Sequence, residues 1–126
     1  MEFFTKDSGE RKSFDSGMNR DTDKDKPKFE LLIPKGQKYE DTLMYRWAML
    51  LRRGADKYGL RNWELANSVE EMERFKSSAS RHFIQWMSDL DDGEDHAAAV
   101  LFNINAVEFL KQKMQSTKDS NNFVPK

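Results

Sequence analysis

The sequence predicts an all-α protein: a helical hairpin plus a third long helix, preceded by an extended N-terminal arm. Three long segments carry apolar residues at spacings of three and four. A capping pattern and an Asp-Asp-Gly turn separate these segments, whereas the first 36 residues show no such periodicity. We therefore divide the chain into an arm (1–36), a helical domain (37–115) and a polar tail (116–126).

The N-terminal arm is rich in charge and poor in apolar residues. Residues 1–36 contain eight acidic and eight basic side chains. This composition predicts a flexible segment with few points of attachment. The expected attachments are its four phenylalanines and a short apolar stretch that leads onto the core: Phe3, Phe4, Phe14, Phe29 and residues 31–34.

The first helix is expected over residues 39–58, where apolar side chains recur at helical spacing. Gly59 is placed to end it in a left-handed conformation. Gly54 inside the helix costs about 1 kcal/mol relative to alanine, which indicates a close approach by a neighbour or a ligand. Residues 60–67 follow as a connector that Trp63 attaches to the core.

The second helix has the clearest start, because Ser68 and Glu71 form a capping box. We expect it to end near Leu90. Its predicted core face consists of apolar residues at spacings of three and four: Val69, Met72, Phe75, Ala79, Phe83, Trp86 and Leu90.

The third helix is expected over residues 94–115, after a tight turn at 91–93 with Asp92 as the N-cap. Its predicted apolar face is Ala97, Val100, Leu101, Ile104, Val107 and Met114. An antiparallel hairpin centred on the turn would place His82 beside Phe102 and Asn103.

Composition excludes several classes of function. Apolar residues make up 37% of the chain and charged residues 34%, so the core is thin and we expect a homo-oligomer to complete it. The net charge of −1 argues against duplex nucleic acid as the main partner. The chain lacks cysteine, and it has no apolar run long enough for a membrane span. These features predict a soluble cytoplasmic protein.

An acidic run follows the second helix and offers hard oxygen ligands. Five carboxylates precede His96 and can hold Mg²⁺ or Mn²⁺, with Glu94 and Asp95 as the candidate ligands. Helix capping and the helix dipole explain most of the same run without a metal. His82 likewise has two interpretations, a catalytic or ligand-contacting group and a core histidine with one satisfied hydrogen bond.

A basic cluster follows the first helix. Lys57, Arg61 and Asn62 surround Tyr58 and Trp63, and cationic donors beside aromatic rings suit a phosphate with a stacked base. Neighbouring arginines at 52 and 53 are more typical of a solvated helix face.

Several motifs occur in the order found in one known family. They are Ser16–Asp21, Lys26–Phe29, Gly54–Gly59, Arg61–Trp63, Ser80–His82 and Glu94–His96 followed by Asn103. Over residues 13–110 the chain resembles the N-terminal module of phage-type dATP/dGTP diphosphohydrolases, which are associated with MazG-like nucleotide pyrophosphohydrolases.

The resemblance implies binding of a purine nucleotide and release of pyrophosphate from dATP or dGTP, with Mg²⁺ as the cofactor. It also implies a phage-encoded protein that acts in the host cytoplasm. The implied nucleotide contacts are Arg20, Lys26, Lys57, Asn62, Arg81 and Asn103, with Trp63 added from the basic cluster. His82 or His96 would position water, and Glu94 and Asp95 would hold the metal.

The chain departs from the family pattern at the metal site. MazG-like enzymes hold Mg²⁺ between paired carboxylates on two helices. The nearest sets here, around Glu71 and Glu94, lie at opposite ends of the second helix, roughly 30 Å apart, so only an antiparallel subunit contact joins them. A non-catalytic phage protein that sequesters a nucleotide signal of host defence is therefore the alternative. A helical protein–protein adaptor is a third hypothesis, but it leaves the ordered motifs unexplained.

Overall fold

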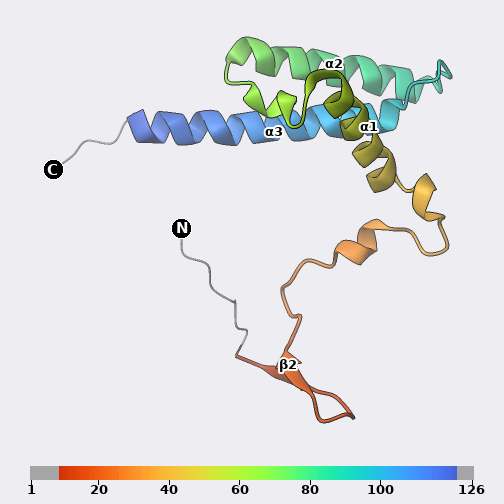
Figure 1. Cartoon of the computed structure of the whole chain (residues 1–126), viewed down its shortest axis with the longest axis vertical. Helices are drawn as coiled ribbons and strands as arrows, with labels where there is room; N and C mark the ends of the chain where they lie inside the picture. Colours follow the sequence, from red (N-terminus) through yellow and green to blue (C-terminus); the bar gives the residue numbers. More distant parts are fainter. Residues whose placement is uncertain (1–8, 122–126) are drawn as a thin grey trace. The chain divides into compact units, whose positions relative to one another are not determined.

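The computed structural model describes residues 9–121, and of these the side chains of 9–118. The chain divides between Lys35 and Gly36 into two compact units, and each is described by itself. In chain order the elements are β1 (Arg11–Ser13), β2 (Asn19–Asp21), η1 (Phe29–Leu32), η2 (Tyr39–Asp41), α1 (Leu43–Tyr58), η3 (Asn62–Leu65), α2 (Val69–Met87) and α3 (His96–Asn121). The predicted helical class is confirmed (Figure 1).

The first unit contains a small β-hairpin that sequence reasoning missed. Strands β1 and β2 pair antiparallel, with Lys12 opposite Arg20. Gly17 lies in the turn with φ +92°, a conformation that favours glycine. Phe14 and Phe29 are 43% and 68% exposed, so they do not anchor the described part of the arm in a core. Phe3 and Phe4 lie outside the described residues.

Helix α1 begins later than predicted. The residues before it form η2, and Thr42 then caps the helix by accepting a hydrogen bond from the Tyr45 amide at 3.2 Å. The Thr42 hydroxyl also donates to the Tyr39 carbonyl at 2.8 Å, and the residue is only 2% exposed. Gly59 ends the helix with a positive φ of +96°, as predicted. Its ψ of 157° lies outside the left-handed helical region, so the conformation itself differs from the predicted one.

Helix α2 begins as predicted and ends three residues early. The Ser68 hydroxyl accepts from the Glu71 amide, and the Glu71 carboxylate accepts from the Ser68 hydroxyl and the Asn67 amide, so the capping box is confirmed. At the other end Asp89 adopts φ +52°, and a pair of hydrogen bonds to Trp86 and Gln85 closes a Schellman motif. Glycine is the usual signal for such a helix end, and here aspartate takes its place, so the sequence predicts the C-terminus of α2 only weakly.

Helix α3 is the centre of the second unit. Helix α2 lies alongside it, and α1 crosses it (Figure 1). Within the described residues α1 packs on α3 but not on α2. Helix α3 runs to Asn121, beyond the predicted end at 115. No helix of the described chain is long and apolar enough to cross a membrane.

The core uses smaller residues than the predicted apolar faces. Its buried apolar members are Ala66, Ala98, Ala99, Ala106, Val107 and Leu110. Alanines let α3 approach two neighbours closely, and Ile104, a predicted core residue, is 48% exposed. On α2 the predicted core positions Val69, Phe83 and Trp86 are also exposed, because α2 packs on a single helix.

The predicted hairpin register is wrong, and the expectation for Gly54 is wrong for a neighbouring element of the protein. His82 lies beside His96 and Phe75 beside Phe102, so the hairpin register differs by about two turns from the one that pairs His82 with Asn103. A Cβ added at Gly54 meets nothing within 4 Å, so no neighbouring element of the described chain requires glycine there, and the approach of a ligand stays a prediction.

Candidate functional site

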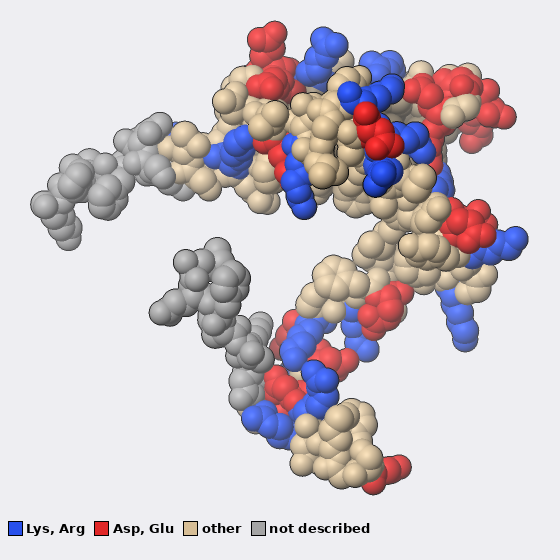
Figure 2. Space-filling model, in the orientation of Figure 1, with Lys and Arg blue, Asp and Glu red and all other residues tan. Residues whose placement is uncertain are grey.

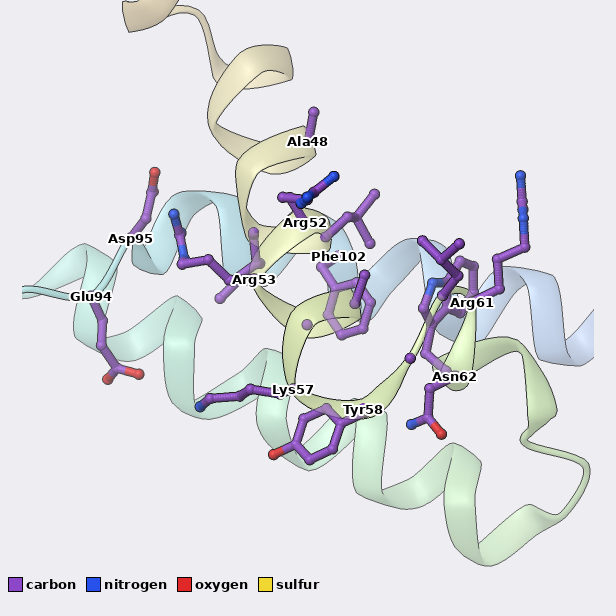
Figure 3. Close-up of a pocket in the computed structure, with 18 of the residues that line it drawn as sticks. Ala48, Arg52, Arg53, Lys57, Tyr58, Arg61, Asn62, Glu94, Asp95 and Phe102 are labelled. Carbon is purple, nitrogen blue, oxygen red and sulfur yellow. The ribbon is translucent and has the colours of Figure 1, made fainter.

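An open groove of about 1080 Å³ runs along the second half of α1, η3 and the start of α3 (Figure 3). It is large enough for a nucleotide. The groove collects residues from motifs far apart in the sequence. Its polar lining includes Lys57, Arg61 and Asn62 from one motif, His82 from α2, and Glu94 and Asp95 from the α2–α3 connection.

The basic residues of the groove differ in their partners. Arg52 pairs with Asp56 at 3.3 Å, and the Arg61 guanidinium lies 2.8 Å from the Glu64 carboxylate. Lys57 has no carboxylate partner among the residues that the structure describes, and it extends into solvent at the groove (Figure 3). Arg53, which also lines the groove, forms no ion pair with a described carboxylate either, so Lys57 and Arg53 are the two groove cations best placed to bind an external anion.

Segment η3 is held against α3 from two sides. The Trp63 ring meets Phe102 and Phe109 edge to face, with centroids 5.8 and 5.4 Å away. The Lys113 ammonium donates to the carbonyls of Glu64 and Ala66 at 2.9 and 2.8 Å. These contacts confirm that Trp63 attaches the connector to the core, and they position Arg61 and Asn62 beside the groove.

Asp95 joins α1 to the start of α3. The Arg46 guanidinium donates to both carboxylate oxygens of Asp95, at 2.7 and 2.8 Å. One of these oxygens also accepts from the Ala98 amide at 3.1 Å, so Asp95 caps α3 where Asp92 was expected to. The Arg46 hydrogen bonds hold the pKa of Asp95 below its usual value. Asp95 is thus fully engaged in a structural role.

His82 lines the groove and contacts a second buried histidine, His96, behind it. The Nδ1 atoms of His82 and His96 lie 2.9 Å apart, and His96 Nε2 lies 2.8 Å from a carboxylate oxygen of Asp92. An ionised carboxylate only accepts, so His96 Nε2 carries a proton. Burial lowers the pKa of His82, with the positive charge of Arg81 as the second cause. His82 therefore carries a neutral imidazole at neutral pH.

Glu94 joins the two histidines, but Asp95 does not. One ligand atom from each of His82, Glu94 and His96 lies within 4.8 Å of the others. Glu94 and Asp95 point in opposite directions from the chain (Figure 3), so the predicted pair does not converge. Acidic side chains gather over the connection between α2 and α3 (Figure 2), where Glu94 lies.

Asn103 and Arg81, the other predicted contacts within the second unit, are not among the residues that line this groove. Asn103 is 5% exposed and donates to the Ala99 carbonyl at 2.8 Å, which is a satisfied core position. Arg81 lies on the exposed side of α2, where it contacts the Ser78 hydroxyl at 3.4 Å. Arg20 is on β2 in the first unit, and Lys26 lies 3.6 Å from the Asp21 carboxylate there.

These features define a helical protein with a mixed cationic and aromatic groove and a histidine–carboxylate cluster. Residues 16–120 match the family described as dATP/dGTP diphosphohydrolase, N-terminal. The chain belongs to this family, as the ordered motifs predict. No curated protein and no solved structure matches the chain.

A diphosphohydrolase family implies a divalent metal ion, but the side chains near Glu94 do not fit Mg²⁺. Mg²⁺ takes oxygen ligands in near-octahedral geometry. The groups beside Glu94 are two imidazoles, and the carboxylate of Asp95 is bound to Arg46. Imidazole nitrogens suit Zn²⁺ and other transition metals instead.

Sequence reasoning missed three residues that position the site. Arg46 binds Asp95 of the groove lining, and Asp92 accepts from the His96 ring and from the Glu94 amide. Lys113 holds η3 against α3 through two carbonyls. The contact of Asp92 is local in the sequence, because Asp92 lies only four residues before His96. Arg46 and Lys113 each reach a partner 49 residues away, and no local pattern predicts that.

Proposed function

We propose that the helical unit binds a purine deoxynucleoside triphosphate in this groove and hydrolyses it to the monophosphate and pyrophosphate. The observation that supports binding is the convergence of Lys57, Arg61 and Asn62 with the histidine cluster on one groove. Family membership supports the reaction. We further propose a phage-encoded protein that acts in the host cytoplasm.

The proposed roles follow from charge and position. Lys57 binds a phosphate group, because it is a groove cation without a carboxylate partner in the described chain. Asn62 offers both a donor and an acceptor to the base or the sugar. Trp63 is packed between Phe102 and Phe109, so it supports the groove wall rather than lying open for stacking. Arg20 and Lys26 remain proposed phosphate contacts from the first unit.

The reaction is attack of water at the α-phosphorus with pyrophosphate as the leaving group. His82 lines the groove and is neutral at neutral pH, so its imidazole can orient the attacking water or accept its proton. His96 acts through His82, because it is more deeply buried and does not line the groove.

Incubation with dGTP and dATP tests the proposal, with chromatography following intact nucleotide, monophosphate and pyrophosphate. We expect pyrophosphate release in the presence of a divalent ion, and nucleotide binding measured by calorimetry in its absence. Lys57→Ala should weaken binding about 10- to 100-fold, because one charge-assisted contact is lost. Lys76→Ala is the matched control, since Lys76 lies on α2 beside Glu73 and not in the groove.

The engagement of Asp95 with Arg46 favours a second candidate, a protein that binds and sequesters a nucleotide signal without cleaving it. The unit lacks a converging carboxylate pair at the predicted metal position. Tight binding with intact nucleotide recovered after heat release would support this candidate over hydrolysis. If neither dATP nor dGTP binds, and Lys57→Ala changes nothing, the groove assignment is wrong.

A further inference from the structure

We infer that His82, Glu94 and His96 form a binding site for a divalent transition-metal ion, with Zn²⁺ as the best fit. The three residues come from α2, from the connection between α2 and α3, and from the first turn of α3. The site borders the groove of the proposed function, but the inference is tested without nucleotide. Failure of one proposal is therefore distinguishable from failure of the other.

The distance between the imidazoles fits a shared ion. Nitrogen ligands lie about 2.0–2.1 Å from Zn²⁺, so two nitrogens on one ion are separated by about 3.0–3.4 Å, depending on geometry. The Nδ1 atoms of His82 and His96 are already 2.9 Å apart. The midpoint of this short distance is too close to both nitrogens for an ion, so Zn²⁺ would lie to one side of the line that joins them. Binding therefore requires the nitrogens to separate by a few tenths of an ångström and the two rings to turn toward the ion.

Asp92 prepares His96 as a ligand. Its carboxylate accepts the Nε2 proton of His96 at 2.8 Å, which leaves Nδ1 as the nitrogen with a lone pair for a metal. A carboxylate on the outer nitrogen of a metal-binding histidine is the usual arrangement in zinc sites, where it fixes the tautomer and the ring orientation. The Glu94 amide donates to the same Asp92 oxygen at 3.1 Å, so Asp92 also holds the backbone of the third ligand.

The site has a closed side and an open side. His96 is 4% exposed and His82 is 9% exposed, so both imidazoles are anchored on packed helices. Glu94 is exposed, and it lines the groove together with His82. Three protein ligands with a fourth position toward a groove are typical of zinc sites that keep a place for water or a ligand.

A simple hydrogen bond also explains the pair of histidines. In that interpretation the His82 Nδ1 proton is donated to the lone pair of His96 Nδ1, and Asp92 accepts from the other side. Glu94 has no role in such a pair, whereas it completes the metal site. Glu94 therefore separates the two interpretations, and as an exposed residue it can be changed without disturbing the core.

The experiment uses the full chain, stripped with a chelator, and measures binding of Zn²⁺ and Co²⁺ by equilibrium dialysis. We expect one ion per chain, a visible Co²⁺ absorption typical of nitrogen and oxygen ligands, and a Tm increase of several degrees. Mg²⁺ should produce neither the Tm increase nor competition with Zn²⁺. Equal competition by Mg²⁺, or no bound Zn²⁺ at all, would overturn the inference.

The variants assign the ligands. Glu94→Gln and His82→Gln should each weaken Zn²⁺ binding at least tenfold, and Asp92→Asn about 10- to 100-fold through His96. Asp91→Asn is the matched control, because Asp91 carries the same charge in the same connection but lies outside the cluster. Unchanged Zn²⁺ affinity in Glu94→Gln would contradict the site even if the histidine variants fail to fold. An equal loss of Zn²⁺ affinity in Asp91→Asn and Glu94→Gln would also contradict the site, because it would show that the negative charge of the connection attracts the ion without a specific ligand.

Discussion

At the scale of single residues, the molecule places non-glycine side chains in a left-handed conformation at three described positions, Asp25, Arg61 and Asp89. Two of them adjoin the groove elements: Arg61 precedes η3, and Asp89 follows α2. In this conformation an L-residue other than glycine is strained, with aspartate tolerated better than most. The left-handed conformation of Asp89 forms the Schellman motif that ends α2. After this motif the chain reverses direction and reaches His96 at the start of α3.

Asp89→Gly is predicted to stabilise the protein. Relief of the left-handed strain outweighs the greater freedom of glycine in the unfolded chain, so the free energy of unfolding should rise by about 0.5–1 kcal/mol. Thermal unfolding followed by circular dichroism checks this, with an expected Tm increase of about 2–6 °C. Asp91→Gly is the control; Asp91 has no positive φ, so glycine there should lower the Tm. A lower Tm in Asp89→Gly would contradict the strain argument.

At the scale of elements, the ends of the helices carry the polar residues that the site depends on. Asp95 caps α3 while it binds Arg46, and the Ser68–Glu71 box starts α2 directly after η3. The hydrogen bonds from Ser68 and Asn67 hold the pKa of Glu71 below its ordinary value of 4.5. We therefore expect the cap of α2 to weaken when the Glu71 carboxylate takes up a proton.

The capping box predicts the direction of one pH dependence. Because the pKa of Glu71 is lower in the folded state, the unfolded chain takes up its proton first as pH falls. Its contribution is complete above about pH 5 and is lost as pH falls through the lowered pKa. In Glu71→Gln the acid-induced loss of Tm between about pH 5 and 3 should be smaller than in the wild type.

Thermal melts at several pH values measure this difference. Glu70→Gln is the matched control, since Glu70 is the neighbouring carboxylate but accepts neither hydrogen bond of the box. If the Tm of the wild type and that of Glu71→Gln change equally with pH, protonation of Glu71 does not contribute to the acid-induced loss of stability.

At the scale of the whole molecule, the second unit exposes much apolar surface for its size. Phe83, Trp86 and Met87 are 45%, 49% and 61% exposed and lie on adjacent turns of α2. Helix α2 packs on α3 alone, which leaves this face without a neighbour in the described chain. A self-complementary contact between two copies is the commonest way in which such a face is covered.

The homo-oligomer expected from composition stays a prediction, and light scattering after size exclusion tests it. We expect a mass of at least twice 14.8 kDa, and a shift to the monomer in Trp86→Lys, which places a charge on the exposed face. Lys76→Glu, a charge change elsewhere on α2, is the control and should keep the wild-type mass. A wild-type mass of 14.8 kDa at all concentrations would contradict the prediction.

Local patterns in the sequence determined the helical class, the capping box of α2, the attachment of the connector through Trp63 and the family. Each of these depends on residues that lie within a few positions of one another, or on motifs in a set order. Periodicity and capping act over one or two helical turns, so sequence alone carries them. The predicted pairing of His82 with Asn103 and the predicted end of α2 were wrong. The pairing depends on how two helices pack, and the end of α2 depends on the left-handed conformation of Asp89 in the turn.

Only the tertiary structure decided which of the candidate residues meet. It brought His82 to His96 rather than to Asn103, and it bound Asp95 to Arg46 instead of leaving it beside Glu94. The physical reason is that the register of two packed helices is set by side-chain volumes along their whole contact, here by alanines of α3. A shift of two turns along α3 changes every partner in the site while leaving the periodicity of each helix the same.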